Sequence, residues 1–217
     1  MILPRIELLP RELLVQTSDV DHADWNYRPL LGKLQRVRFQ LIKALLRDSR
    51  GTDLLEVGYG SGVFFPELLK HCQNISGVDI HPMPAEVSQS IEAAGIRADL
   101  HSADVCDMPF SSDAFDIVVA VSALEYVPDI DKACLEIIRV LRDGGIAVLV
   151  TPGKSPVLDA GLKFLGGEDA EENYGDRREK LLAALDRHFS VERIRKWPWP
   201  ATPWTTIYRA LRLTPRS

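Results

Sequence analysis

Short apolar runs alternate with amphipathic segments between residues 53 and 151. The run 117–121 is apolar at every position, which is typical of a strand that is covered on both faces. The alternation predicts βαβ units and a mostly parallel sheet with helices on both faces. The predicted strands are 53–57, 75–80, 97–102, 115–122 and 145–151, and the predicted helices are 62–71, 84–94 and 129–141.

The pattern changes at both ends of the chain. Residues 1–29 predict irregular structure, and a helix is predicted at 30–47. Its predicted buried stripe is Leu30, Leu34, Val37, Leu41 and Leu45, and its predicted surface carries Lys33, Arg36, Arg38, Lys43 and Arg47. After a glycine-rich and acidic stretch at 153–175, we expect a helix at 176–187 and an antiparallel hairpin made of 189–196 and 204–213.

A glycine-rich turn follows the first predicted strand. Gly58, Gly60 and Gly62 stand at every second position after Glu56. Such a turn brings backbone N–H groups and a helix N-terminus close to a ligand. The spacing differs from the G-x-G-x-x-G of dinucleotide enzymes, because residue 63 is Val. Glu56 would sit badly beside a phosphate but well beside an ammonium or a sulfonium, so we expect a nucleotide-like cofactor that carries such a group.

The E-x-G-x-G-x-G spacing resembles motif I of the class I S-adenosylmethionine-dependent methyltransferases, of the type 11 kind. Later segments are similar to the family's further motifs, in the same order, so the resemblance covers roughly residues 53–152. These segments are 77–80, 102–110, 114–127 and 140–150. The resemblance implies that S-adenosyl-L-methionine is the cofactor.

The resemblance also implies roles for individual residues. Asp79 suits the two ribose hydroxyls, because one carboxylate accepts both O–H bonds. Asp104 would face the adenine amino group and the N–H of Val105 a ring nitrogen. The ring of Tyr59 either packs over the methionine end of the cofactor or projects outward, so that only its backbone matters. The cofactor-binding candidates are Glu56, Gly58, Tyr59, Gly60, Gly62, Asp79, Ile80, Asp104, Val105 and Ser122.

Two segments are candidates for the acceptor side of the site. Residues 19–29 are expected to cover the methyl-donor end, with Trp25 and Tyr27 facing the pocket; the alternative is ordinary docking of a terminal arm. Glu125 and Tyr126 follow the fourth strand at its carboxyl end, where open α/β sheets bind ligands, and their alternative role is packing at a helix entry. No catalytic residue is assigned.

Composition and charge narrow the range of partners. The net charge of −5 argues against bulk attraction to nucleic acid. Three widely spaced cysteines without a C-x-x-C pair, and five histidines without a ligand-like pair, predict no metal site and a cytoplasmic protein. Charges near the N-terminus break any signal-peptide core, and no apolar run approaches the ~20 residues that span a bilayer.

The sequence therefore predicts an α/β fold with a Rossmann-like, doubly wound sheet, mostly parallel with an antiparallel C-terminal edge strand. We expect one methyltransferase domain over residues 1–217, with an N-terminal arm and helix (1–50), a cofactor-binding core (51–152), and a C-terminal insert with edge strands (153–217). The predicted function is in-line methyl transfer to a small molecule. The alternatives are an RNA or protein methyltransferase and a non-catalytic cofactor-binding module, and the acceptor, a general base and the oligomeric state stay open.

Overall fold

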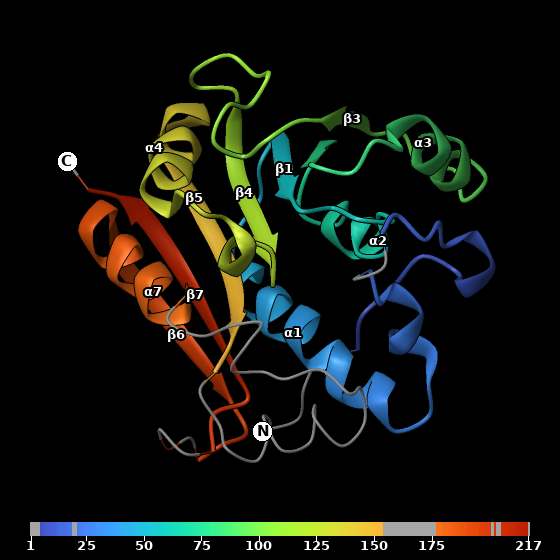
Figure 1. Cartoon of the computed structure of the whole chain (residues 1–217), viewed down its shortest axis with the longest axis horizontal. Helices are drawn as coiled ribbons and strands as arrows, with labels where there is room; N and C mark the ends of the chain where they lie inside the picture. The colour runs from blue at the N-terminus through green and yellow to red at the C-terminus, as the bar shows by residue number, and fades with distance from the viewer. Residues whose placement is uncertain (1–4, 19–20, 154–176, 201, 203–204, 217) are drawn as a thin grey trace.

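The computed structural model describes residues 5–18, 21–153, 177–200, 202 and 205–216. Within them, seven strands form one sheet in the order β3-β2-β1-β4-β5-β7-β6 (Figure 1). Neighbours from β3 to β5 pair in parallel, and β7 runs antiparallel to both β5 and β6. The strands are β1 (Asp53–Val57), β2 (Asn74–Asp79), β3 (Asp99–Ser102), β4 (Phe115–Val121), β5 (Leu141–Pro152), β6 (Phe189–Trp197) and β7 (Tyr208–Pro215).

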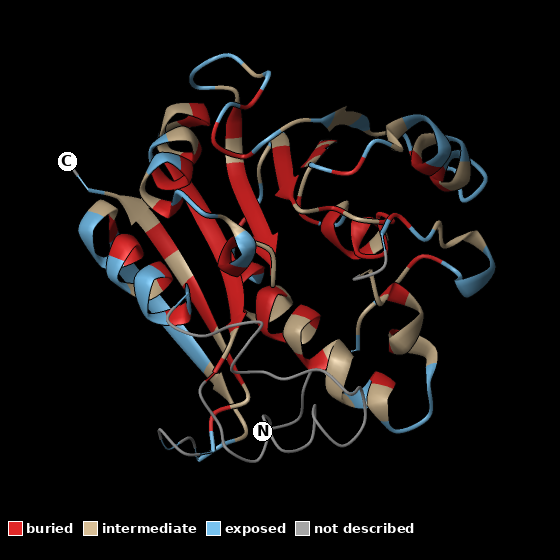
Figure 2. Cartoon of the chain, in the orientation of Figure 1, coloured by how far each residue is buried: buried red, intermediate tan, exposed pale blue. Residues whose placement is uncertain are grey.

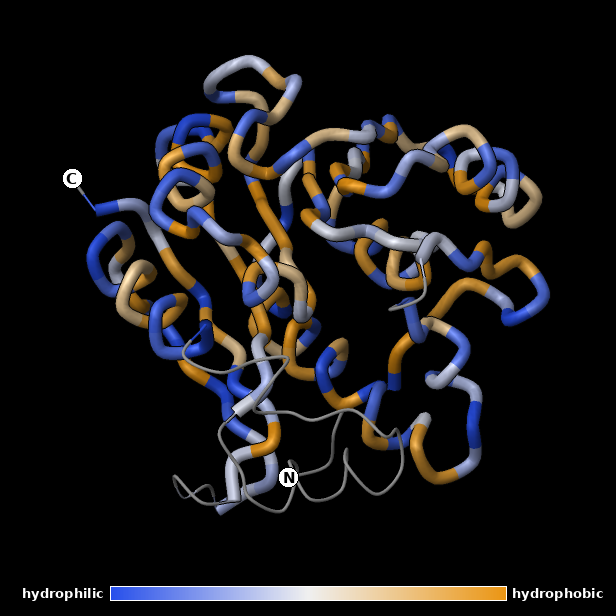
Figure 3. The backbone as a smooth tube through the Cα atoms, viewed as in Figure 1, coloured by the Kyte–Doolittle hydropathy of each residue, from blue (hydrophilic) through white to orange (hydrophobic). Residues whose placement is uncertain are grey.

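Helices cover both faces of the sheet. Residues of α1 (Leu31–Leu46), α2 (Phe65–Leu68) and α3 (Pro84–Glu92) share one hydrophobic core, and residues of α4 (Ile130–Val140) and α7 (Arg177–His188) share the other. Along β1, Leu54 faces the first core and Leu55 the second. This alternation explains why the central strands β1, β4 and most of β5 are buried and apolar at nearly every position (Figures 2 and 3). The predicted α/β fold with a mostly parallel sheet is confirmed.

One predicted helix is shorter in the structure, and the structure fixes an order of the last two strands that the sequence had left open. The helix predicted at 62–71 is reduced to α2, because Gly62 has a φ of +68°, outside the range of a right-handed helix. The predicted antiparallel hairpin at the C-terminal edge of the sheet is confirmed, and within it the last strand in sequence, β7, lies between β5 and β6. β7 has buried apolar residues on both of its faces, whereas β6 is charged and exposed along most of its length. The more polar strand, β6, therefore lies at the edge of the sheet.

Three short 3-10 helices complete the described structure: η1 (Arg11–Leu13), η2 (Ala23–Tyr27) and η3 (Leu124–Tyr126). No helix in the described part of the chain has the length and apolar content needed to cross a membrane. Most of the segment 153–175 lies outside the described residues, as do residues 19 and 20.

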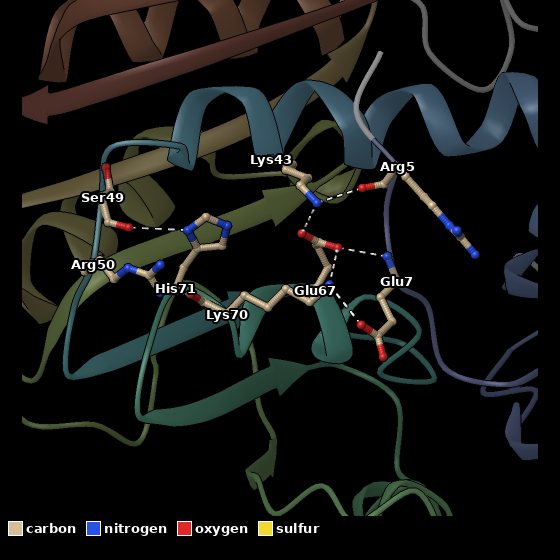
Figure 4. A network of polar contacts seen from close by, with 8 residues as sticks. All are labelled: Arg5, Glu7, Lys43, Ser49, Arg50, Glu67, Lys70 and His71. Atoms are coloured by element: carbon tan, nitrogen blue, oxygen red, sulfur yellow. Dashed lines mark hydrogen bonds and ion pairs between the residues drawn. The ribbon is translucent and has the colours of Figure 1, made fainter. Parts of the chain in front are cut away.

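A buried carboxylate anchors the N-terminal arm to the domain (Figure 4). Glu67 of α2 is 1% exposed and accepts from the Lys43 ammonium at 2.7 Å, the Lys70 ammonium at 3.1 Å and the Glu7 N–H at 2.8 Å. Nearby, the Leu9 N–H donates to the Val63 carbonyl at 3.0 Å. The arm is therefore held against α1 and against the segment that follows the glycine-rich turn.

Replacing Glu67 by Gln should destabilise the fold while keeping the size of the side chain. We expect the free energy of unfolding at pH 7 to fall by about 1.5–3 kcal/mol, the range for hydrogen bonds to a charged group. Burial raises the pKa of Glu67, but hydrogen bonds from Lys43, the Glu7 backbone and Lys70 outweigh it and hold the pKa below its ordinary value of 4.5. The contribution of the ionised group is thus present above pH 4.5 and is lost as the pH falls through the folded-state pKa.

Chemical denaturation of Glu67→Gln and the parent protein between pH 3 and pH 8 measures this difference. Glu86→Gln is the matched control, because Glu86 is exposed on α3 and should change stability by less than about 0.5 kcal/mol. A difference between Glu67→Gln and the parent that does not shrink in acid would contradict the assignment.

Candidate functional site

A cavity of about 580 Å³, called the larger cavity below, opens where the carboxyl ends of β1, β2 and β4 meet. Its volume lies within the ordinary range for small-molecule sites. The structure brings most of the predicted site residues together on its walls. These are Trp25, Glu56, Gly58, Tyr59, Gly60, Asp79, Ile80, Asp104, Val105, Ser122 and Tyr126.

Three predicted residues lie off the cavity wall. Gly62 is under the turn, where an added Cβ would come within 3.0 Å of the Phe65 ring. The hydroxyl of Tyr27 donates to the Leu9 carbonyl, which ties η2 to the N-terminal arm instead of facing the ligand. Glu125 is 2% exposed and lies behind the wall, in η3. Tyr27 and Glu125 are therefore placed to support the site rather than to touch a ligand in the larger cavity.

Gly58 lets two strand ends approach closely. Its φ is +73°, and an added Cβ would lie 2.4 Å from the Cβ of Ala123, just after β4. Its N–H donates to the Val78 carbonyl of β2 at 2.8 Å. A side chain at this position would push the turn away from β4, so the cavity floor requires glycine here.

Gly60 is held on both sides, by the last residue of β2 and by a residue that follows the strand. Its N–H donates to Asp79 Oδ2 at 2.8 Å, and its carbonyl lies 3.1 Å from His81 Nε2. The Met83 N–H donates to His81 Nδ1 at 3.2 Å, so Nε2 carries the ring proton and donates to Gly60. Sequence reasoning missed His81, whose only signal is its position two residues after Asp79.

The ring of Tyr59 turns away from the cavity. It packs on Gly77 of β2, where an added Cβ would lie 2.6 Å from Tyr59 Cδ1, and it meets the His81 ring edge-on at a centroid distance of 4.8 Å. Of the two roles left open for Tyr59, this placement favours the one in which its backbone lines the cavity.

Glu56 presents an unpaired carboxylate to the cavity. The residue is 3% exposed, and its Oε2 has no hydrogen-bond partner in the described structure. Burial and the nearby charge of Asp79 raise the pKa of Glu56 well above its ordinary value, and Arg38 opposes the rise. A buried carboxylate of this kind gains most from a cationic ligand such as an ammonium.

Arg38 corrects the prediction that it lies on the charged surface of the helix at 30–47. It reaches from α1 to the cavity wall, and its Nε is buried without a hydrogen-bond partner in the described structure. The helical stripe did not reveal this, because Arg38 stands between the buried Val37 and Phe39 of α1, and its side chain meets the cavity instead of solvent. Glu56 and Arg38 together suit the ammonium and the carboxylate of an amino acid.

The remaining walls suit the nucleoside part of the expected cofactor. Ile80 lines the cavity yet is 79% exposed, which leaves an apolar side chain for a planar base. Asp104 lines the cavity, and its Oδ1 accepts from the Cys106 N–H at 2.8 Å, which fixes the position of the carboxylate. Ser122 has a φ of +54° and a buried hydroxyl with no partner among the described residues. The residues present therefore fit S-adenosylmethionine.

The N-terminal arm supplies another wall. The Thr17 N–H and the Ala23 N–H hold the Asp21 carboxylate, which lies 3.8 Å from the place where a Cβ on Gly60 would be. Trp25 stacks on His22 with ring centroids 4.0 Å apart. Both rings line the larger cavity, so the described part of residues 19–29 lies beside the site.

Comparisons with known proteins identify methyltransferases as relatives of this chain. Residues 55–149 match the family described as "Methyltransferase domain". The chain is 31% identical over 180 residues to an uncharacterized methyltransferase of Mycobacterium sp. (strain JLS), across 76% of this chain and 67% of that protein. It is 34% identical over 106 residues to a phosphatidylethanolamine N-methyltransferase of Cereibacter sphaeroides, across 48% of this chain and 52% of that protein. The chain thus spans about half the length of this curated relative.

Solved structures show the same fold at low sequence identity. The N-methyltransferase NodS from Bradyrhizobium japonicum WM9, in complex with S-adenosyl-l-homocysteine, matches with a TM-score of 0.63 and 15% identity, over 93% of this chain and 95% of that one. The [4+2]-cyclase SpnF matches with a TM-score of 0.66 and 18% identity, over 86% of this chain and 82% of that one. The fold therefore accommodates more than one reaction.

Gly58→Ala should weaken cofactor binding through the clash with Ala123. We expect the affinity for S-adenosylhomocysteine, measured by calorimetry, to fall about tenfold or more. Gly144→Ala is the matched control, because Gly144 has a φ of +77° and nothing within 4 Å of an added Cβ. The control should lose about 1–2 kcal/mol of stability from backbone strain alone and keep its affinity. Equal loss of affinity in both variants would show that backbone strain, and not the clash with Ala123, weakens cofactor binding.

Proposed function

The chain belongs to the S-adenosylmethionine-dependent methyltransferases, and from this premise we propose that it transfers a methyl group to a small-molecule acceptor bound in the larger cavity. The membership confirms the resemblance and the cofactor expected from the motifs. The observation that carries the proposal is that Arg38 and the buried Glu56, each with a polar atom that has no partner among the described residues, line the same cavity of about 580 Å³ beside the glycine-rich turn.

In this proposal each binding residue has a separate task. Glu56 takes the ammonium and Arg38 the carboxylate of the methionine end, and Asp79 takes the ribose hydroxyls with the lone pairs that Gly60 leaves free. Asp104 and the Val105 N–H take the adenine edge. These groups come from α1, β1, β2 and the segment after β3, so binding the cofactor draws on the whole carboxyl edge of the sheet.

Positioning is the main contribution of the chain to the reaction. S-adenosylmethionine, when bound, supplies a methyl group already activated by its sulfonium. The residues on the acceptor side need only to hold the acceptor atom in line and to keep water out. Trp25, Phe39 and Val127 give that side apolar walls, and Tyr126 adds a hydroxyl. No proton acceptor is assigned, because an amine and a hydroxyl acceptor differ in whether they need one.

Two substitutions should separate the two ends of the cofactor site. Glu56→Gln should weaken S-adenosylhomocysteine binding by about 1.5–3 kcal/mol, the range for hydrogen bonds to a charged group, and leave 5′-methylthioadenosine unchanged, because that ligand lacks the amino-acid end. Asp79→Asn should weaken both ligands, while its amide oxygen still accepts from the Gly60 N–H. Calorimetry with the two ligands reads out both effects.

If Glu56→Gln weakens both ligands equally, Glu56 shapes the turn and does not bind an ammonium. If Asp79→Asn changes neither affinity but lowers the melting temperature, its carboxylate serves only to hold Gly60.

The acceptor class can be tested with S-adenosylmethionine that carries a labelled methyl group. The label should enter the low-molecular-weight or lipid-extractable fraction of a cell extract. The Gly58→Ala variant should transfer at least about tenfold less label, in line with its loss of cofactor affinity. Label found only in RNA or protein would contradict the proposal. Cofactor binding without transfer to any fraction would identify a binding module instead.

A further inference from the structure

A second cavity of about 260 Å³, called the smaller cavity below, adjoins the larger one. It lies between the first turns of α7 and the strands β5, β7 and β6, and Pro152 at the end of β5 lines both cavities. The motifs for the cofactor assign it no role.

Three polar residues lie side by side on one face of the sheet in this cavity. Thr151 of β5 pairs with Arg209 of β7, and Arg209 pairs with Lys196 of β6. Residues that pair directly across antiparallel strands project from the same face. Arg178 of α7 covers the row and is 5% exposed, and its Nη1 donates to the Gly153 carbonyl at 2.8 Å.

The charge of this row is unfavourable unless an anion joins it. Lys196 and Arg209 are like charges directly opposite each other, which destabilises a strand pair. Neither makes an ion pair with another residue in the described part of the chain, and Glu179 is the one acid among the described lining residues. The Thr151 hydroxyl is also buried without a hydrogen-bond partner there, in a residue that is 2% exposed.

We propose that the smaller cavity binds an oxyanion, a phosphate or carboxylate group of the methyl acceptor, whose reactive atom reaches past Pro152 into the larger cavity. This rests on the proposed function. The Thr151 hydroxyl, Arg209 and Lys196 donate to the oxyanion, and Arg178 adds a positive charge from the helix side. The acceptor is thereby held at its anionic end, away from the methyl group.

Glu125 links the two cavities electrostatically. Burial raises its pKa to about 7, and the guanidinium groups of Arg178 and Arg38 oppose the rise. Both arginines thus act on the same carboxyl group. Arg38 lines the larger cavity, whereas Arg178 lines the smaller one. This buried carboxyl balances cations on both sides of the boundary that an acceptor would cross.

Titration of the protein with inorganic phosphate at low ionic strength tests the site without cofactor or acceptor. Arg209→Gln and Lys196→Gln should each lower the phosphate affinity several-fold, and the double variant at least about tenfold. Removing one of two opposed cations should leave the melting temperature unchanged or raise it. Arg195→Gln is the matched control, because Arg195 is exposed on the same strand but pairs with Ala210, on the other face.

Phosphate binding that is absent, or equally strong in the double variant, would overturn the inference. S-adenosylhomocysteine binding, measured on the same samples, should be unchanged in every variant. A failure of the phosphate site therefore remains distinct from a failure of the proposed function.

Two further arms identify the source of the anion. Competition of phosphate by phosphatidylcholine vesicles that contain phosphatidic acid, and not by phosphatidylcholine alone, would indicate a lipid headgroup. Competition by a soluble phosphate monoester and not by either vesicle would indicate a free metabolite. Failure of all three to displace phosphate would contradict the role of the site in acceptor binding.

Discussion

The close approach of Gly58 to Ala123 is the constraint on which the larger cavity depends. It brings the end of β1 against the segment after β4, while the Gly58 N–H also bonds to β2. Gly60, two residues later, is held by hydrogen bonds to Asp79 and His81. Three strand ends thus meet at two glycines that carry no side chain of their own, so the space above the turn stays available to a ligand.

Buried charge gathers along the same edge. Glu56 and Glu125 are both almost fully buried, and the pKa of each is raised mainly by burial. Arg38 approaches them from α1 on one face of the sheet, and Arg178 approaches Glu125 from α7 on the other. Burying such groups is unfavourable unless they find partners of opposite charge. A zwitterionic cofactor and an anionic acceptor would provide them, which connects the burial of these charged groups to binding.

The N-terminal arm contributes through its anchoring. Glu67 holds Glu7 and, through Lys43, also α1, so the arm and the helix that carries Arg38 are bound to the same carboxylate (Figure 4). The Asp21 and Trp25 walls follow from this placement, because both residues lie between the anchored segment and α1. Residues far from the glycine-rich turn in sequence therefore complete the cavity.

The sequence alone determined the elements whose signal is local. Apolar runs such as 117–121 predicted the buried strands, and the glycine spacing behind Glu56 predicted the turn, because strand burial and positive φ constrain residue types directly. The residues gathered at the cavity follow from the rule that ligands bind at the carboxyl ends of parallel strands. What only the tertiary structure decided were the relations between distant segments. Local patterns were not enough to assign Arg38 and His81 to the site. The role of Arg38 depends on the packing of α1 beside the cavity, and that of His81 depends on its contact with Gly60. The row from Thr151 to Lys196 exists because β7 lies between β5 and β6. This order buries the more apolar of the last two strands, and it depends on pairing between distant segments, which no short-range pattern expresses.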